Sequence, residues 1–258
     1  MKKFFYYLIV ITLFASCKSQ FPIAYNPQAA KDPNHTNYIK PKNEAIISSD
    51  TLEIKNQNKL FKATTYNIAG RSFKANQIES YQDKSGYYLN IPRYGLTQSL
   101  TGPRINVFRC YYTSTTYDAQ TGRTRTSTRS VHIIKKAGQP DLATESLKIT
   151  NTIAGWVEDN NEAYEQAQLA QMYVKKIKTH RLISWGAIIG GFALMIADPS
   201  VKSTNPNAKP SIAYAGAILV PAGMINLGLN LGRRGKVGRS LASAINIYNE
   251  APEKKKKR

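Results

Sequence analysis

Few residues of this chain could carry out chemistry. The sequence contains two cysteines, Cys17 and Cys110, and three histidines, which are His35, His132 and His180. Two cysteines exclude a disulfide-rich framework and a four-cysteine zinc site, and the histidines are widely spaced. The sequence also contains no nucleophile elbow, HExxH zinc motif, Walker A loop or dinucleotide-binding fingerprint. We therefore predict that the protein is not an enzyme, has no catalytic residues and binds no metal or cofactor.

Cys110 is the first candidate for a reactive thiol. It lies in an apolar and aromatic stretch, 107–112, which favours burial as a small and inert side chain. A catalytic cysteine needs an electropositive pocket that stabilises its thiolate, and Arg109 and His132 could supply one by composition only. An envelope hydrolase built on these residues, or on a carboxylate, is therefore the least favoured functional class.

Residues 1–17 have the organisation of an export signal. Two lysines are followed by an apolar run over 4–14, and two small residues then precede Cys17. The apolar run is short for a permanent membrane-spanning helix. The sequence therefore predicts a secretory signal peptide over 1–16.

The cysteine after the small pair Ala15 and Ser16 resembles the lipobox of bacterial lipoproteins, and in particular the relaxed lipoboxes of Bacteroidota. The usual pattern has leucine three places before the cysteine, where this chain has Phe14, with Leu13 one place further back. The resemblance implies that Cys17 becomes the first residue and carries fatty-acyl chains such as palmitate. An ordinary cleaved signal, or an uncleaved anchor, is the alternative.

The same resemblance predicts a location in the cell envelope. Cys17 is followed by a lysine and not by an acidic run of the kind that resembles surface-export signals in that group. We therefore expect a membrane-anchored lipoprotein that faces the periplasm, and the choice between inner and outer membrane stays open.

The composition is basic but otherwise typical of a folded protein. The 258 residues include 36 lysines and arginines against 16 acids, a formal net charge of +20, and 42% are hydrophobic. These values exclude a disordered polyelectrolyte and a uniformly apolar membrane protein. The length allows one or two domains with enough chain for a core. Export argues against nucleic acid as a partner, in spite of the positive charge.

The first half of the mature chain predicts a tether and a β-domain. Residues 17–45 contain four prolines and no regular apolar period, which predicts a lipidated cysteine followed by a flexible tether. Residues 46–140 contain short apolar or aromatic runs between polar and glycine residues, which predicts an antiparallel β-domain. A sandwich, a roll and an open barrel all fit this pattern. The expected strands are 51–55, 59–66, 72–81, 86–92, 104–117 and 123–135.

The last two of these strands predict a long hairpin with a basic row. Arg123, Arg125 and Arg129 alternate with threonines, and residues two apart share one face of a strand. One interpretation is a site for an anionic lipid or glycan. The other is a solvated hairpin edge, on which the charges prevent unwanted strand pairing.

Helical periodicity begins after the β-domain. It predicts an amphipathic helical segment over 141–181, interrupted near 158–161, where Asn160 or Asn161 can cap a second helix. A further amphipathic helix and a basic tail are predicted over 233–258, and we expect the tail to be solvated.

Two uncharged apolar segments lie between these helices. Residues 182–197 and 211–232 carry no charge and are joined by a polar loop. A membrane-spanning helix needs about 20 apolar residues, so the second segment is long enough and the first is marginal. Together they predict an apolar, glycine-rich helical hairpin over 182–232 that associates with a membrane. A buried hairpin in a soluble domain is the alternative.

Small residues allow helices to approach closely in lipid. Gly186 and Gly190 on the first segment, and Gly228 and Gly232 on the second, have the four-residue spacing that favours such packing. The segment 182–232 resembles the glycine-zipper two-transmembrane lipoproteins of bacterial envelopes, although it lacks their long GxxxGxxxG runs. The four glycines are therefore the candidates for helix packing.

The charges around the hairpin conflict with a periplasmic location. Lysines and arginines are concentrated before residue 182 and after residue 232, and the positive-inside rule places such flanks in the cytoplasm. A lipidated Cys17 lies outside the cytoplasm, and two spans keep the rest of the chain there. We give precedence to the lipobox, because it is a positional chemical signal whereas the charge rule is statistical.

Together these features predict an α+β protein, in which a small antiparallel β-domain is followed by an amphipathic helix and a C-terminal helical hairpin. The favoured function is that of a non-enzymatic cell-envelope lipoprotein, a structural or accessory subunit of a membrane complex. Its partners would be membrane lipid, through Cys17 and the 182–232 hairpin, and a membrane protein or a second copy of the chain. The alternative is a periplasmic module that binds an anionic lipid or glycan through the β-domain.

Overall fold

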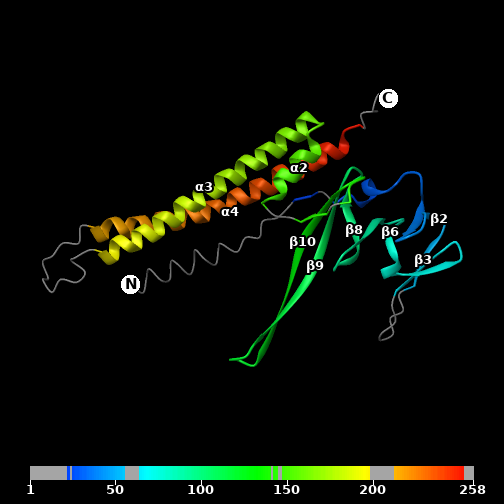
Figure 1. Ribbon diagram of the computed structural model, residues 1–258, viewed down its shortest axis with the longest axis horizontal. Coiled ribbons are helices and arrows are strands. Elements are labelled where there is room, and N and C mark those ends of the chain that lie inside the picture. The colour runs from blue at the N-terminus through cyan, green and yellow to red at the C-terminus, as the bar shows by residue number, and fades with distance from the viewer. Residues whose placement is uncertain are drawn as a thin grey trace. The chain divides into compact units, whose positions relative to one another are not determined.

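A computed structural model gives the architecture of the chain (Figure 1). It describes residues 22–23, 25–55, 64–140, 142–144, 147–197 and 212–252. The predicted signal peptide, Cys17 and the end of the basic tail lie outside the described residues. The described residues form an antiparallel β-domain followed by helices, which confirms the predicted α+β class.

The chain divides into two compact units. The first, called the β-unit, contains Ile23–Ala163 and Ile245–Arg258. The second, called the helical unit, contains Tyr164–Ala244 together with Met1–Pro22.

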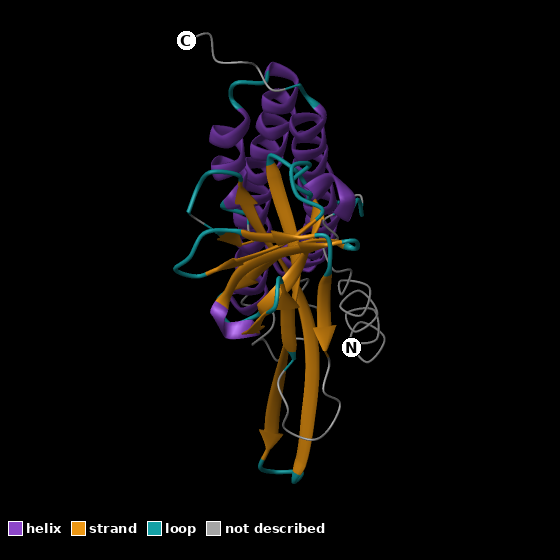
Figure 2. Cartoon of the chain, turned by 90° about the vertical axis from the view of Figure 1, so that its right-hand side faces the viewer, coloured by secondary structure: helices purple, strands orange, loops and turns teal. Residues whose placement is uncertain are grey.

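The β-unit is built on an eight-stranded antiparallel sheet with the order β11-β10-β9-β8-β7-β6-β1-β2 (Figure 2). Strands β6 to β11 follow one another as a meander, which short turns can connect because neighbouring strands are antiparallel. The first two strands extend the sheet beyond β6. The strands are β1 Asn37–Pro41, β2 Ile47–Ser49, β6 Ile78–Asp83, β7 Gly86–Ile91, β8 Gly95–Thr101, β9 Ile105–Asp118, β10 Arg123–Lys136 and β11 Ala143–Thr144.

A second antiparallel sheet packs against the first. Its three strands are β3 Leu52–Lys55, β4 Thr65–Ile68 and β5 Arg71–Lys74. Ile68 and Phe73 of this sheet share one buried cluster with Ile39 and Ile78 of the larger sheet. Two sheets therefore share a core over this part of the domain, as in a sandwich.

The predicted flexible tether over 17–45 is wrong for much of its length. Ile23 is buried, the short helix η1 (Pro27–Ala30) contacts β7 and β8, and β1 pairs on both sides, with β2 and β6. The side chain of Gln82, which is fully buried, donates to the carbonyl oxygens of Asp32 and His35. Pro27 begins η1 and Pro41 ends β1, and a missing N–H is tolerated at such positions, so these prolines concealed the order.

Three further differences separate the expected elements from the structure. Strand β8 was not expected, because its sequence, GLTQSLT, contains only two large apolar residues and gives little alternation. The expected strand over 72–81 is broken by the short helix η2 (Ala75–Gln77), and the helical segment expected from 141 begins later, with α2 (Ile149–Val157). The β6–β7 and β9–β10 hairpins agree with the expected pairs of strands.

Two long helices form the described part of the helical unit. Helix α3 is Asn161–Ala197 and helix α4 is Ile212–Glu250. Contacts of Gly216 with Gly191, of Gly223 with Ser184 and of Asn226 with His180 show that the helices run antiparallel. Each predicted amphipathic segment continues into the adjacent apolar segment without a break, because no proline stands at either junction and the glycine at 232 keeps helical geometry within α4.

Candidate functional site

A long two-stranded ribbon carries the predicted basic row. Strands β9 and β10 pair over fourteen residues each. Beyond Cys110 on β9 and Val131 on β10, neither strand pairs with a third strand in the described chain, and nearly all side chains are exposed. We call residues 111–118 and 123–130 the arm, which extends well past the other strands (Figure 1, Figure 2).

The two faces of the arm differ in chemistry. Arg129 pairs with Tyr112 and Arg125 with Thr116, so the arginines share a face with β9 hydroxyl groups. An open hollow of about 390 Å³ lies on this face. It is lined by Tyr112, Ser114, Thr116, Arg125, Ser127 and Arg129. The opposite face carries threonine pairs, such as Thr113 and Thr128, whose hydroxyl oxygens are 3.3 Å apart.

The arginine face could hold an anionic group. Guanidinium groups bind carboxylates and phosphates through two parallel hydrogen bonds, and the hydroxyl groups between Arg125 and Arg129 offer further donors. Arg123 lies on the same face, nearer the turn. Asp118 belongs to the turn, where hydrogen bonds from the Thr121 hydroxyl and from nearby backbone amides lower the pKa of its carboxyl.

The structure does not bring Cys110 and His132 together. Cys110 is 2% exposed and lies in a cluster with Phe108 and Ile133, where burial raises the pKa of its thiol. His132 pairs with Arg109 across the ribbon and therefore lies on the other face from Cys110. A raised pKa keeps the thiol protonated, so Cys110 lacks the properties of a nucleophile.

Helices α3 and α4 are each long and apolar enough to cross a membrane. In the most apolar window of each helix, only 17% is buried inside the protein. A helix that is hydrophobic all round and belongs to a soluble protein is normally buried in a core, and these are not. Within 182–197 of α3 and 212–229 of α4, the exposed large apolar residues are Leu182, Ile183, Trp185, Ile189, Phe192 and Ile196, and Ile212, Tyr214, Ile218, Leu219, Ile225 and Leu229.

Glycines form the contact between α3 and α4, but they are not the predicted ones. A Cβ atom added to Gly223 would lie 2.7 Å from the Ser184 carbonyl oxygen, and one added to Gly191 would lie 2.8 Å from a Val220 methyl carbon. A Cβ atom on Gly216 would collide with the Gly191 carbonyl oxygen. Such distances require glycine, because they are below any normal carbon contact.

The four predicted glycines face away from this contact. A Cβ atom added at Gly186, Gly190, Gly228 or Gly232 would meet no other atom within 4 Å. Four-residue spacing identifies a helix face but not the face that meets the partner helix. As sites of packing against another molecule, the four glycines remain a prediction.

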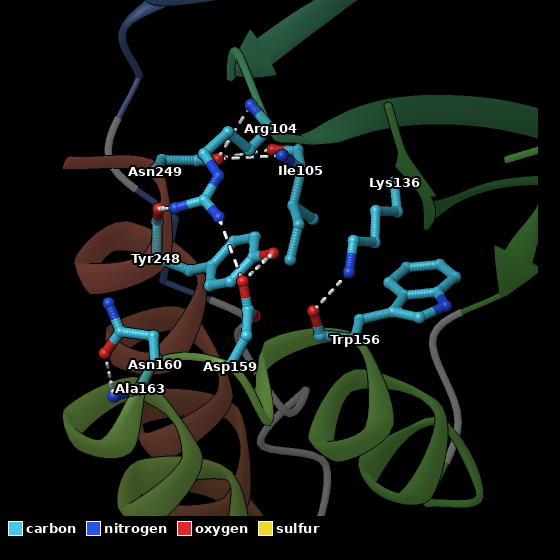
Figure 3. A network of polar contacts seen from close by, with 9 residues as sticks. All are labelled: Arg104, Ile105, Lys136, Trp156, Asp159, Asn160, Ala163, Tyr248 and Asn249. Atoms are coloured by element: carbon cyan, nitrogen blue, oxygen red, sulfur yellow. Dashed lines mark hydrogen bonds and ion pairs between the residues drawn. The ribbon is translucent and has the colours of Figure 1, made fainter. Parts of the chain in front are cut away.

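The last turn of α4 is joined to the start of β9 by a polar network within the β-unit (Figure 3). The Asn249 side chain accepts hydrogen bonds from the amides of Arg104 (3.1 Å) and Ile105 (2.7 Å) and donates to the Ile105 carbonyl (3.0 Å). The Arg104 guanidinium stacks 3.7 Å from the Tyr248 ring centre and forms an ion pair with Asp159 (3.4 Å). Because these groups bond mainly to each other and to backbone, the network is a structural joint.

No family model, curated protein or solved structure matches this chain. Function must therefore be inferred from the geometry of its own residues.

One residue of the joint lies in an element that the sequence predicts. Tyr248 belongs to the amphipathic helix predicted over 233–258, and it is 2% exposed. Arg104 and Asn249 carried no signal, because polar side chains that bond to distant backbone follow no local period.

Of the two residues predicted as alternative helix caps, Asn160 and Asn161, the structure shows Asn160 in this role. Its side-chain oxygen accepts a hydrogen bond from the Ala163 amide at 3.1 Å (Figure 3). We expect Asn160→Ala to lower the free energy of unfolding by about 1 kcal/mol, because an N-terminal amide of α3 loses its acceptor. Urea titration followed by circular dichroism measures the change. The neighbouring substitution Asn161→Ala is the control, and equal losses in both variants would contradict the capping role.

Proposed function

We propose that this protein is a non-enzymatic lipoprotein of the bacterial cell envelope, held in the membrane by α3 and α4 and by acyl chains on Cys17. The exposed apolar surface of the two helices carries the proposal. A continuous surface of this kind is unfavourable in water and marks a membrane or partner interface.

The length of the apolar surface supports insertion. At ~1.5 Å per residue, residues 182–197 rise about 24 Å and residues 212–229 about 27 Å. The hydrocarbon core of a bilayer is about 30 Å thick, and Arg181 can extend its side chain to the interface. The hairpin thus has the dimensions of a membrane-embedded pair of helices.

The lipid anchor and the periplasmic location are inferred from the sequence around Cys17. The role of structural or accessory subunit is supported by the β-unit, which presents an exposed arm. Among the described residues, the Cys110 thiol and the His132 imidazole, which a cysteine hydrolase would pair, lie on opposite faces of the ribbon. These observations favour a protein that positions or binds other molecules.

A cleavable anchor tests the proposal. A protease site placed between Cys17 and Pro22 allows the acylated end to be removed from isolated membranes. We expect the cut chain to stay in the pellet after carbonate extraction, because the embedded helices retain it. A cut chain with Ile189→Lys, Phe192→Lys and Ile218→Lys is the control and should be released, since each charge opposes insertion by about 2.5–3.5 kcal/mol.

Two outcomes would count against the proposal separately. Release of the cut chain with the native helices would exclude the hairpin as an anchor. An unmodified mature N-terminal peptide in mass spectrometry would exclude acylation of Cys17.

A second candidate function is binding of an anionic lipid or glycan by the arm, which the hollow between Arg125 and Arg129 favours. We expect the triple variant Arg123→Gln, Arg125→Gln and Arg129→Gln to bind polygalacturonate at least ~10-fold more weakly, since charge-assisted hydrogen bonds are worth about 1.5–3 kcal/mol each. Equilibrium sedimentation with this probe measures the change.

The control is a variant that loses the same number of positive charges as the triple arginine variant. Lys42, Lys74 and Lys84 are exposed on the β-unit and away from the arm. If their replacement by glutamine weakens binding as much as the arginine variant does, the arm has no specific role.

A further inference from the structure

Eight basic residues gather on one section of the helical unit. We call them the basic belt. They are Lys175, Lys176, Lys178 and Arg181 on α3, and Arg233, Arg234, Lys236 and Arg239 on α4. All are exposed except Arg233, which is half-buried, and among the described residues none forms an ion pair. Within the described part of Tyr164–Ala244, the acid that accompanies them is Glu165.

Contacts between the helices place the belt on a single section. The amide of Asn226 donates to the His180 carbonyl oxygen (3.4 Å), and the Lys236 ammonium lies 5.7 Å from the centre of the Tyr173 ring. Residues 168–181 of α3 therefore lie opposite residues 226–239 of α4. This section is about 20 Å long, and it adjoins the apolar section directly.

The residues that form the contact between α3 and α4 also change where the basic belt begins. In the apolar section, the contact is formed by Gly191, Gly216 and Gly223. At the start of the belt, amide side chains enter the contact, and Asn230 is only 6% exposed, with an amide nitrogen that has no partner among the described residues. A buried amide is costly in hydrocarbon. The exposed basic residues and the amide side chains in the helix contact thus place the end of the apolar section at the same residues, and the two observations are independent.

We propose that the basic belt begins in the headgroup layer of the membrane and binds anionic phospholipid headgroups. The inference rests on the proposed insertion of α3 and α4. It adds the class of lipid that is bound and the depth at which the hairpin lies in the membrane. Clusters of four to eight lysines and arginines next to a membrane helix attract anionic lipids. Their long side chains reach phosphate groups while their stems stay on the apolar surface. The described part of the helical unit has a formal net charge of +7, which is complementary to the negative charge of anionic phospholipids.

Trp185 gives a natural probe for a test. It lies one turn from Arg181 on α3 and is exposed, and the other tryptophan is removed by Trp156→Phe. The full acylated chain is reconstituted into vesicles of phosphatidylcholine and phosphatidylglycerol in equal amounts, with bromine on the acyl chains of one lipid at a time. Quenching of Trp185 by each brominated lipid gives their relative association with the helix.

Two variants with equal loss of charge complete the experiment. The belt variant combines Lys175→Gln, Lys178→Gln and Arg181→Gln, and the arm variant combines Arg123→Gln, Arg125→Gln and Arg129→Gln. We expect phosphatidylglycerol to be preferred by at least about fivefold in the native chain and in the arm variant, which is the effect of one basic residue near the headgroups. The preference should be markedly weaker in the belt variant, which keeps five of the eight basic residues, and it should disappear in high salt.

The outcomes separate the two proposals. Equal quenching by both lipids in the native chain overturns the belt proposal and leaves insertion intact. Absence of quenching by either lipid overturns insertion and the belt together. Loss of the preference in the arm variant, with retention in the belt variant, also overturns the belt proposal and assigns the lipid preference to the arm.

Discussion

Leucine at Gly216 is expected to force α3 and α4 apart, whereas leucine at Gly190 is not. A Cβ atom at Gly216 would collide with the Gly191 carbonyl oxygen and lie 2.6 Å from the Met195 Cγ atom. The neighbours include backbone, which cannot rotate away as a side chain can. We expect Gly216→Leu to lower the free energy of unfolding by at least about 3 kcal/mol, the upper end of the range for overpacked cores.

Gly190 provides a matched control on the same hairpin. A Cβ atom added there meets no atom within 4 Å, and leucine favours a helix over glycine by about 0.8 kcal/mol. Gly190→Leu should therefore be neutral or stabilising. Titration with sodium dodecyl sulfate, followed by Trp185 fluorescence in the Trp156→Phe background, measures both variants. Equal stability of the two would show that the glycine contact does not hold the hairpin.

Removal of the Asn249 side chain is expected to loosen the start of β9. Asn249→Ala leaves the Arg104 and Ile105 amides and the Ile105 carbonyl without their partner. Each lost bond is worth about 1 kcal/mol, so we expect a local loss of about 3 kcal/mol. Hydrogen exchange of a peptide that covers Arg104 and Ile105 should then become ~100-fold faster.

Asn249→Asp distinguishes the hydrogen bonds from the packing. An aspartate keeps both acceptor bonds to the Arg104 and Ile105 amides and loses only the donor bond to the Ile105 carbonyl. We therefore expect these two amides to stay protected in Asn249→Asp. If Asn249→Ala exchanges as slowly as the native chain, then the polar network is not the joint that we describe.

Local signals allowed the ribbon and the helix cap to be predicted. Strands β9 and β10 alternate threonine, valine and tyrosine on either side of a turn that contains Asp118 and Gly122, and both the pairing and the turn follow from neighbours in sequence. Asn160 precedes a helical period and bonds to a residue three places later. Such features depend on a few adjacent residues, and the sequence shows them directly.

Contacts between distant segments could not be read in this way. The strand at Asn37–Pro41 is stabilised by pairing with β6, forty residues later, and Pro41 favours a loop when the segment is read alone. The joint between Arg104 and Asn249 spans 145 positions. The choice of Gly216 over Gly228 depends on which face of α4 meets α3, and the spacing of the glycines is the same for several faces.

The buried part of the β-unit begins close to Cys17 in the sequence. Six residue steps separate Cys17 from Ile23, which is buried in the β-unit. A fully extended chain of that length spans only about 20 Å. In the proposed lipoprotein, acyl chains on Cys17 would therefore keep Ile23 within about 20 Å of the membrane surface.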